Sequence, residues 1–102
     1  MSDPLTPTAG ARYVLERVSA GERAARYRGR VLTPDAAFEY DVELTAGDEP
    51  VLRADAPAPG ELEKTLTMIA RLTARGVDKR LEDGLPPWPE RITRWRGPGR
   101  GR

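Results

Sequence analysis

The chain has 102 residues, with 17 Lys and Arg against 16 Asp and Glu, and a net charge of +1 at pH 7. It contains no Cys, His, Asn or Gln, which excludes disulfides, thiolate or imidazole catalysis, and the usual zinc ligand sets. We therefore expect one small domain that uses no metal or cofactor and is not an enzyme.

Apolar residues, Gly and Pro are unevenly distributed, and this divides the chain into three parts. Residues 1–10 are predicted to be a disordered lead, 11–83 a single α+β domain, and 84–102 an extended tail rich in Pro, Trp, Arg and Gly. No apolar run approaches the length of a membrane span, and the N-terminus lacks the pattern of a secretion signal. These features predict a cytoplasmic protein without a membrane partner.

The first element of the expected domain is ambiguous. Residues 11–18 alternate imperfectly between two faces, which favours a strand. Val14, Leu15 and Val18 also fit a helical turn. Both interpretations stay open at this point.

The clearest pattern is a predicted hairpin over residues 23–45, in which side chains alternate on both sides of a turn at 33–36. Closing that turn places three arginines opposite three carboxylates and puts apolar side chains opposite one another on the other face. The charged pairs are Arg30 with Glu39, Arg28 with Asp41, and Arg26 with Glu43; the apolar pairs are Val31 with Phe38, Tyr27 with Val42, and Ala25 with Leu44. A shift of one residue would bury the charges, so we expect this register and these ion pairs.

Residues 51–56 follow a turn and predict a further strand. In that strand Leu52 points inward and Arg53 lies near Glu43. Together these segments predict an antiparallel β-meander of three or four strands.

One amphipathic helix is predicted over residues 61–75, packed on one face of the sheet. Its stripe recurs at helical spacing along Leu62, Leu66, Ile69, Thr73 and Val77. We expect Gly76 to end the helix in the left-handed conformation. Met68 and Leu72 lie beside the stripe, where they form either the edge of the core or a patch for a partner.

The tail carries the sharpest functional signal. Residues 91–102 contain five arginines and no acid, so the net charge of +1 leaves residues 1–90 at −4. The candidate binding residues are Arg91, Arg94, Trp95, Arg96, Arg100 and Arg102. An aromatic plane between two guanidinium groups, as in Arg94-Trp95-Arg96, stacks on bases and neutralises phosphates. The closing Gly/Arg run resembles the tails of many RNA-associated proteins.

The tail also has a structural interpretation. Trp88, Ile92 and Trp95 can fold back and complete a core that is short of apolar residues, with the arginines reaching outward to water. The sequence leaves this alternative open.

Two functions follow from these patterns. The leading hypothesis is a small interaction or assembly module that self-associates and whose basic tail docks an acidic protein surface. The expected partner is thus another protein or a second copy of the chain. The alternative is a nucleic-acid-binding accessory protein that uses the Arg/Trp tail to bind single-stranded DNA or RNA.

Overall fold

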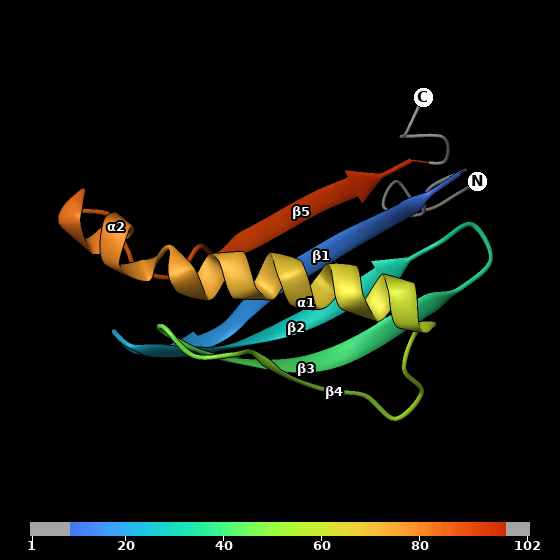
Figure 1. Cartoon of the computed structure of the whole chain (residues 1–102), viewed down its shortest axis with the longest axis horizontal. Coiled ribbons are helices and arrows are strands. Elements are labelled where there is room, and N and C mark those ends of the chain that lie inside the picture. The colour runs from blue at the N-terminus through green and yellow to red at the C-terminus, as the bar shows by residue number, and fades with distance from the viewer. Residues whose placement is uncertain (1–8, 98–102) are drawn as a thin grey trace.

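The computed structural model describes residues 9–97, which form a β-sheet crossed on one face by a long helix (Figure 1). The elements in chain order are β1 (Ala11–Ala20), β2 (Ala24–Leu32), β3 (Ala37–Thr45), β4 (Val51–Arg53), α1 (Gly60–Arg75), α2 (Val77–Glu82) and β5 (Arg91–Arg96). Arg100 and Arg102, which belong to the predicted binding residues, lie outside the described residues, as does most of the expected N-terminal lead. Neither helix in this part of the chain has the length and apolar content to span a membrane.

The β2–β3 hairpin has the register that the charge pattern predicts. Every expected pair, charged or apolar, is a cross-strand neighbour, including Arg26 opposite Glu43. The turn closes with a 2.9 Å hydrogen bond from the Thr33 N–H to the Ala36 carbonyl. Strict alternation above one buried face is what specifies this register.

The predicted contact of Arg53 with Glu43 is present, but the arginines of the hairpin do not form the directly opposed ion pairs that were expected. The pairs within 4 Å are Arg26 with Asp41 (3.1 Å), Arg30 with Glu16 of β1 (4.0 Å), and Arg53 with Glu43. Arg28 and Glu39 make no ion pair with another described residue. The physical reason is reach, because an arginine side chain is long enough to contact a carboxylate diagonally along the neighbouring strand.

Residues 11–20 form strand β1, which settles the ambiguity of the first element. Tyr13 and Leu15 belong to the core that faces the helix. The pairing of β1 with β2 shifts between Arg17 and Ser19, and the bulge leaves Val18 unpaired and 62% exposed. The bulge accounts for the break in alternation at Val18 but not for Val14, which precedes it and is fully buried on the same face as Glu16.

Within residues 9–97 the sheet has five strands in the order β4-β3-β2-β1-β5, so the expected meander of three or four strands is too small. The additional strand is β5, which comes from the segment predicted as an extended tail. It runs antiparallel to β1, with Ile92 opposite Leu15 and Arg94 opposite Tyr13. The first and last strands therefore lie side by side at one edge of the sheet (Figure 1).

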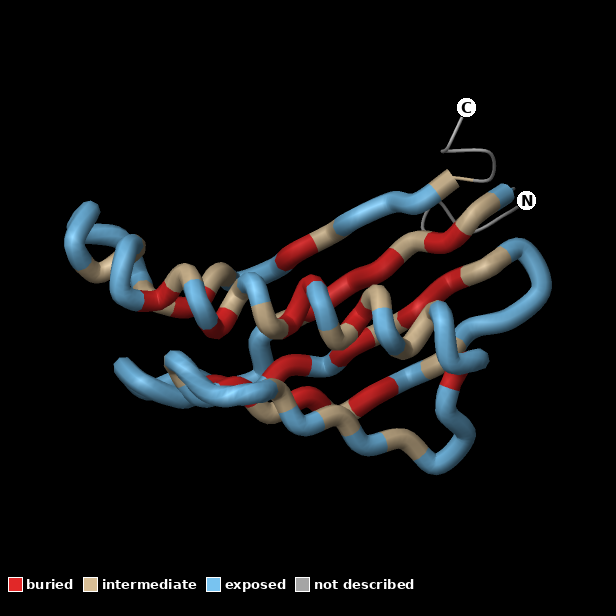
Figure 2. The backbone as a smooth tube through the Cα atoms, viewed as in Figure 1, coloured by how far each residue is buried: buried red, intermediate tan, exposed pale blue. Residues whose placement is uncertain are grey.

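Helix α1 lies over β1, β2 and β3, whereas β5 lies to one side of the helix (Figure 1). The buried helical residues are Leu66, Ile69, Ala70 and Ala74 of α1, and Val77 of α2. They pack on alternate residues of the strands, and Figure 2 shows this core as red segments along the strands and the helix. Gly76 has φ −82° and donates its N–H to carbonyls of the preceding turn. The expected left-handed cap is therefore wrong, and α2 follows directly.

Candidate partner-binding surface

The segment between α2 and β5 is held against the fold by Trp88. Its side chain is 1% exposed and meets the ring of Tyr27 edge-on, with ring centroids 6.5 Å apart. The indole Nε1 donates to the Glu22 carbonyl at 3.2 Å, and the Trp88 carbonyl accepts from Arg17 Nη1 at 2.9 Å. Trp88 therefore folds back into the core, one of the two alternatives that the sequence left open.

Tyr27 provides a second anchor for the same segment. Its hydroxyl donates to the Pro89 carbonyl at 2.6 Å. Burial of the side chain raises the pKa of Tyr27 to about 12, against smaller opposing effects of Arg17 and Arg80. The phenol thus remains a neutral donor at ordinary pH, and residues 88 and 89 are bonded to the sheet just before β5 begins.

The other end of β5 is positioned by Gly10, which precedes β1. Gly10 has φ +72°, and a Cβ on this residue would clash with the carbonyl oxygen of Arg96. Glycine is required here both by the backbone conformation and by the close approach of the two backbones. Because β5 is held at both ends, its side chains have defined directions.

The pleat of β5 divides the predicted binding residues between the two faces of the sheet. Arg94 and Arg96 lie on the helix side, whereas Arg91 and Trp95 lie on the open side. Trp95 is therefore not placed between two guanidinium groups, because neighbouring side chains of a strand point to opposite faces. It lies opposite Arg12 of β1 and is 47% exposed.

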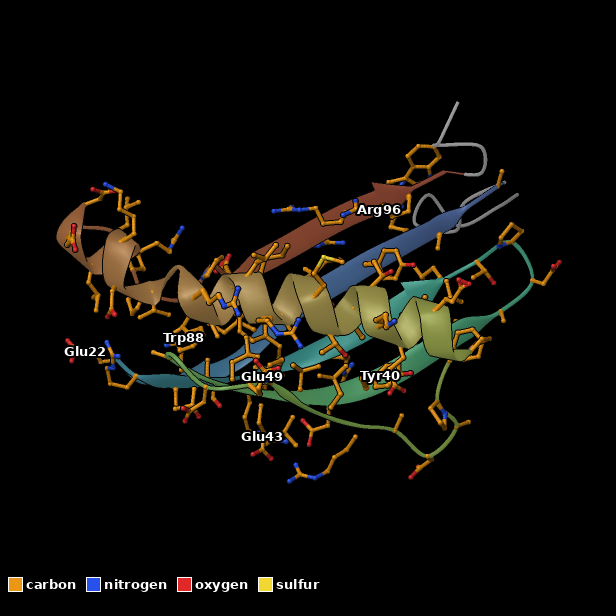
Figure 3. All side chains as sticks on the ribbon, in the orientation of Figure 1. Glu22, Tyr40, Glu43, Glu49, Trp88 and Arg96 are labelled. Carbon is orange, nitrogen blue, oxygen red and sulfur yellow. The ribbon has the colours of Figure 1, made fainter. Side chains whose placement is uncertain are left out.

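On the helix side, the arginines of β5 share a groove with the apolar residues predicted beside the helix stripe. Met68 is 45% exposed and Leu72 59%, so both are surface residues. They line a groove of about 370 Å³ between the helices and β5, together with Arg94 and Arg96. Figure 3 shows Arg96 at the end of β5. The fold thus brings together two features that lie far apart in the sequence.

This groove, called the basic groove, has an apolar floor and a cationic rim. Its floor includes Met68, Leu72 and Ile92, and its cations are Lys79, Arg80, Arg94 and Arg96, with no acidic lining residue. Lys79 pairs with Asp83 at 3.4 Å. None of the three arginines has a carboxylate of another described residue within 4 Å. Their positive charge is therefore not balanced locally.

The open side of the sheet has a hollow of about 490 Å³ with mixed charge. Arg26, Arg28 and Arg53 line it together with Glu39 and Asp41. Arginines and carboxylates that alternate across neighbouring strands largely cancel one another's field. The basic groove is therefore the stronger candidate for binding a ligand of one charge sign.

Within residues 9–97 no group of three or more His, Cys, Asp or Glu side chains is arranged to hold a metal ion. Comparisons of the chain with protein-family models, with curated proteins and with solved structures gave no match. The chemistry of the basic groove is thus the basis for assigning a function.

Proposed function

We propose that this protein is a non-enzymatic interaction module that docks an acidic segment of another protein in the basic groove. The observation that carries the proposal is the charge of the groove rim. Three arginines without a carboxylate partner among the described residues surround exposed apolar side chains.

The apolar and the cationic side chains of the basic groove together favour a partner that combines apolar and acidic side chains. Covering Met68 and Leu72 removes apolar surface from water, which contributes about 25 cal/mol per Å². Carboxylates that meet Arg94 and Arg96 would form charge-assisted hydrogen bonds, which are stronger than neutral ones. Arginine is also among the residues that most often dominate the binding energy of protein interfaces.

A single-stranded nucleic acid is the competing ligand for the same arginines. Because Arg94 and Arg96 lie on one side of β5 and Arg91 and Trp95 on the other, a nucleic acid would have to wrap around the sheet edge to contact all four. An acidic protein segment can use both the apolar and the cationic side chains of the groove through contacts with Arg94, Arg96 and their apolar neighbours, whether or not it also reaches Arg91. This difference favours a protein partner.

A second copy of the chain is the other protein partner that the sequence pattern predicts. Pairing of two β5 strands would bring six arginines and no carboxylate into one strand pair, and unbalanced like charges on neighbouring strands are destabilising. Self-association is therefore proposed only through surfaces other than β5. Light scattering of the isolated protein measures whether the chain self-associates. A monomeric result would leave a different protein as the proposed partner.

Binding of a synthetic peptide that alternates Glu and Val tests the proposal on the full chain. Fluorescence anisotropy compares the wild type with the double variant R94Q/R96Q, in which the groove loses two charges. The matched control is R26Q/R53Q, which removes two exposed charges on the open side of the sheet. We expect the groove variant to weaken binding at least about tenfold and the control to have little effect.

Two additional measurements separate the alternatives. The variant M68S/L72S, which removes the apolar floor without changing the charge, should also weaken peptide binding. A single-stranded oligonucleotide serves as the second probe. Equal losses in the groove and control variants, or binding of the oligonucleotide without binding of the peptide, would contradict the proposal.

A further inference from the structure

The outer edge of β5 carries a defined set of backbone groups. The Arg17 N–H donates to the Glu90 carbonyl at 2.9 Å, and the β1–β5 register places these two residues opposite each other. Antiparallel ladders alternate between hydrogen-bonded and non-hydrogen-bonded pairs, so every second residue after Glu90 is bonded to β1. The N–H and C=O groups of Arg91, Thr93 and Trp95 therefore point away from the sheet.

Two of these outward carbonyls are occupied by side chains of β5 itself. Arg94 Nη1 donates to the Thr93 carbonyl at 2.9 Å, and Arg96 Nη1 donates to the Trp95 carbonyl at 3.2 Å. Among the described residues no strand lies beyond β5. The guanidinium groups thus cover a free sheet edge, and charged side chains commonly protect such edges from unwanted pairing.

We propose that the acidic partner binds in extended form and adds a sixth strand to the outer edge of β5. Its carboxylates draw the guanidinium groups of Arg94 and Arg96 away from the edge carbonyls, and its own N–H groups replace them there. The inference rests on the proposed function and specifies the form of the partner. A neutral or basic strand provides no carboxylate for the displaced guanidinium groups, so the two arginines select for an acidic strand.

The side chains of the added strand would alternate between two environments. Those on the helix side lie over the basic groove, next to Arg94 and Arg96. Those on the open side lie next to Arg91 and Trp95. Acidic side chains suit both sides because each side of β5 carries an arginine, whereas a second copy of β5 contains no carboxylate.

Amide hydrogen exchange, followed by NMR on the full chain with the Glu/Val peptide, tests strand addition directly. We expect the N–H groups of Arg91, Thr93 and Trp95 to exchange at least about tenfold more slowly when the peptide is bound. Ile92 and Arg94 are bonded to β1 in the free protein and serve as internal references.

A matched ligand separates backbone pairing from side-chain docking. The same peptide, N-methylated at alternate amides, keeps its charges but loses the donors that strand addition needs. It should bind at least about tenfold more weakly. On the protein, Thr93→Pro removes an outward N–H without removing a bond to β1, and Thr93→Val retains that N–H as the control.

The outcomes distinguish the two proposals. Slower exchange at the three outward amides, together with weaker binding of the N-methylated peptide, supports strand addition. Equal affinity for both peptides with unchanged exchange would overturn strand addition and leave the proposed function intact. Failure of both peptides to bind would overturn both proposals.

Discussion

The β2–β3 hairpin and the β1–β5 pair are both antiparallel ladders, but they balance their charges differently. The hairpin sets arginines of β2 against carboxylates of β3, and Arg26 and Arg30 each have a carboxylate within 4 Å. Strand β5 carries three arginines and no acid. The arginines of the hairpin thus lie among carboxylates. On β5 only Arg91 lies opposite a carboxylate, that of Glu16, and among the described residues no arginine of β5 has a carboxylate within 4 Å, which is why we propose a binding partner there.

The two ladders also differ in what holds them together. A short turn joins β2 to β3, so little chain entropy is lost when they pair. Strand β5 comes from the opposite end of the chain to β1 and depends on the anchors at Trp88 and Tyr27. The pairing of β5 should therefore be the easier one to break.

Trp88→Ala should have the largest effect and should separate the two ladders. Loss of the buried indole is expected to lower the free energy of unfolding by about 3–5 kcal/mol, measured by chemical denaturation. Amides of β5 should then exchange faster than those of the hairpin. Trp95→Ala, at a half-exposed position on β5, is the control and should cost about 1 kcal/mol or less. Equal losses in both variants would contradict the anchoring role of Trp88.

Tyr27→Phe should have an intermediate effect on stability. The Pro89 carbonyl loses its donor, which should lower the free energy of unfolding by about 1–3 kcal/mol in denaturant titrations. An unchanged stability would show that this hydrogen bond does not hold the segment before β5.

Alkaline pH tests the same anchor without a substitution. The pKa of Tyr27 is about 12 in the folded protein, against an ordinary value of 10.0, so folding favours the neutral phenol. Its contribution to stability is complete below about pH 10 and is lost as the pH rises toward about 12. Denaturation at stepped pH should show a shallower decline for Tyr27→Phe, with Tyr40, whose pKa burial also raises, still contributing. Identical declines would contradict this assignment.

Asp41→Asn should have the smallest effect, because it removes one exposed ion pair of the hairpin. The expected loss in the free energy of unfolding is about 0.2–1 kcal/mol, smaller at high salt. Glu39→Gln is the matched control, since Glu39 makes no ion pair with a described residue. A much larger loss, or the same loss in the control, would contradict a weak stabilising ion pair between Arg26 and Asp41.

The candidate site was predictable in its parts but not as a whole. Met68, Leu72, Arg94 and Arg96 were each recognisable from the sequence, as exposed apolar positions or as cations. Lys79 and Arg80 were not predicted as binding residues. Lys79 nevertheless lies seven residues after Leu72, a spacing that places both on one side of a helix. The helix end predicted at Gly76 lies between Leu72 and Lys79, so the sequence pattern did not place the two residues on one helix.

Sequence patterns alone were enough to predict the α+β class, the register of the β2–β3 hairpin, the amphipathic helix and the basic end of the chain. Each of these depends on periodicity or on near neighbours, which a local pattern records. The folded structure was needed to establish that residues 91–96 pair with β1, that their pleat separates Trp95 from Arg94 and Arg96, and that two of these arginines border an apolar groove. Those outcomes depend on contacts of Trp88 and Tyr27 between distant parts of the chain, and on which side of a strand each residue then faces.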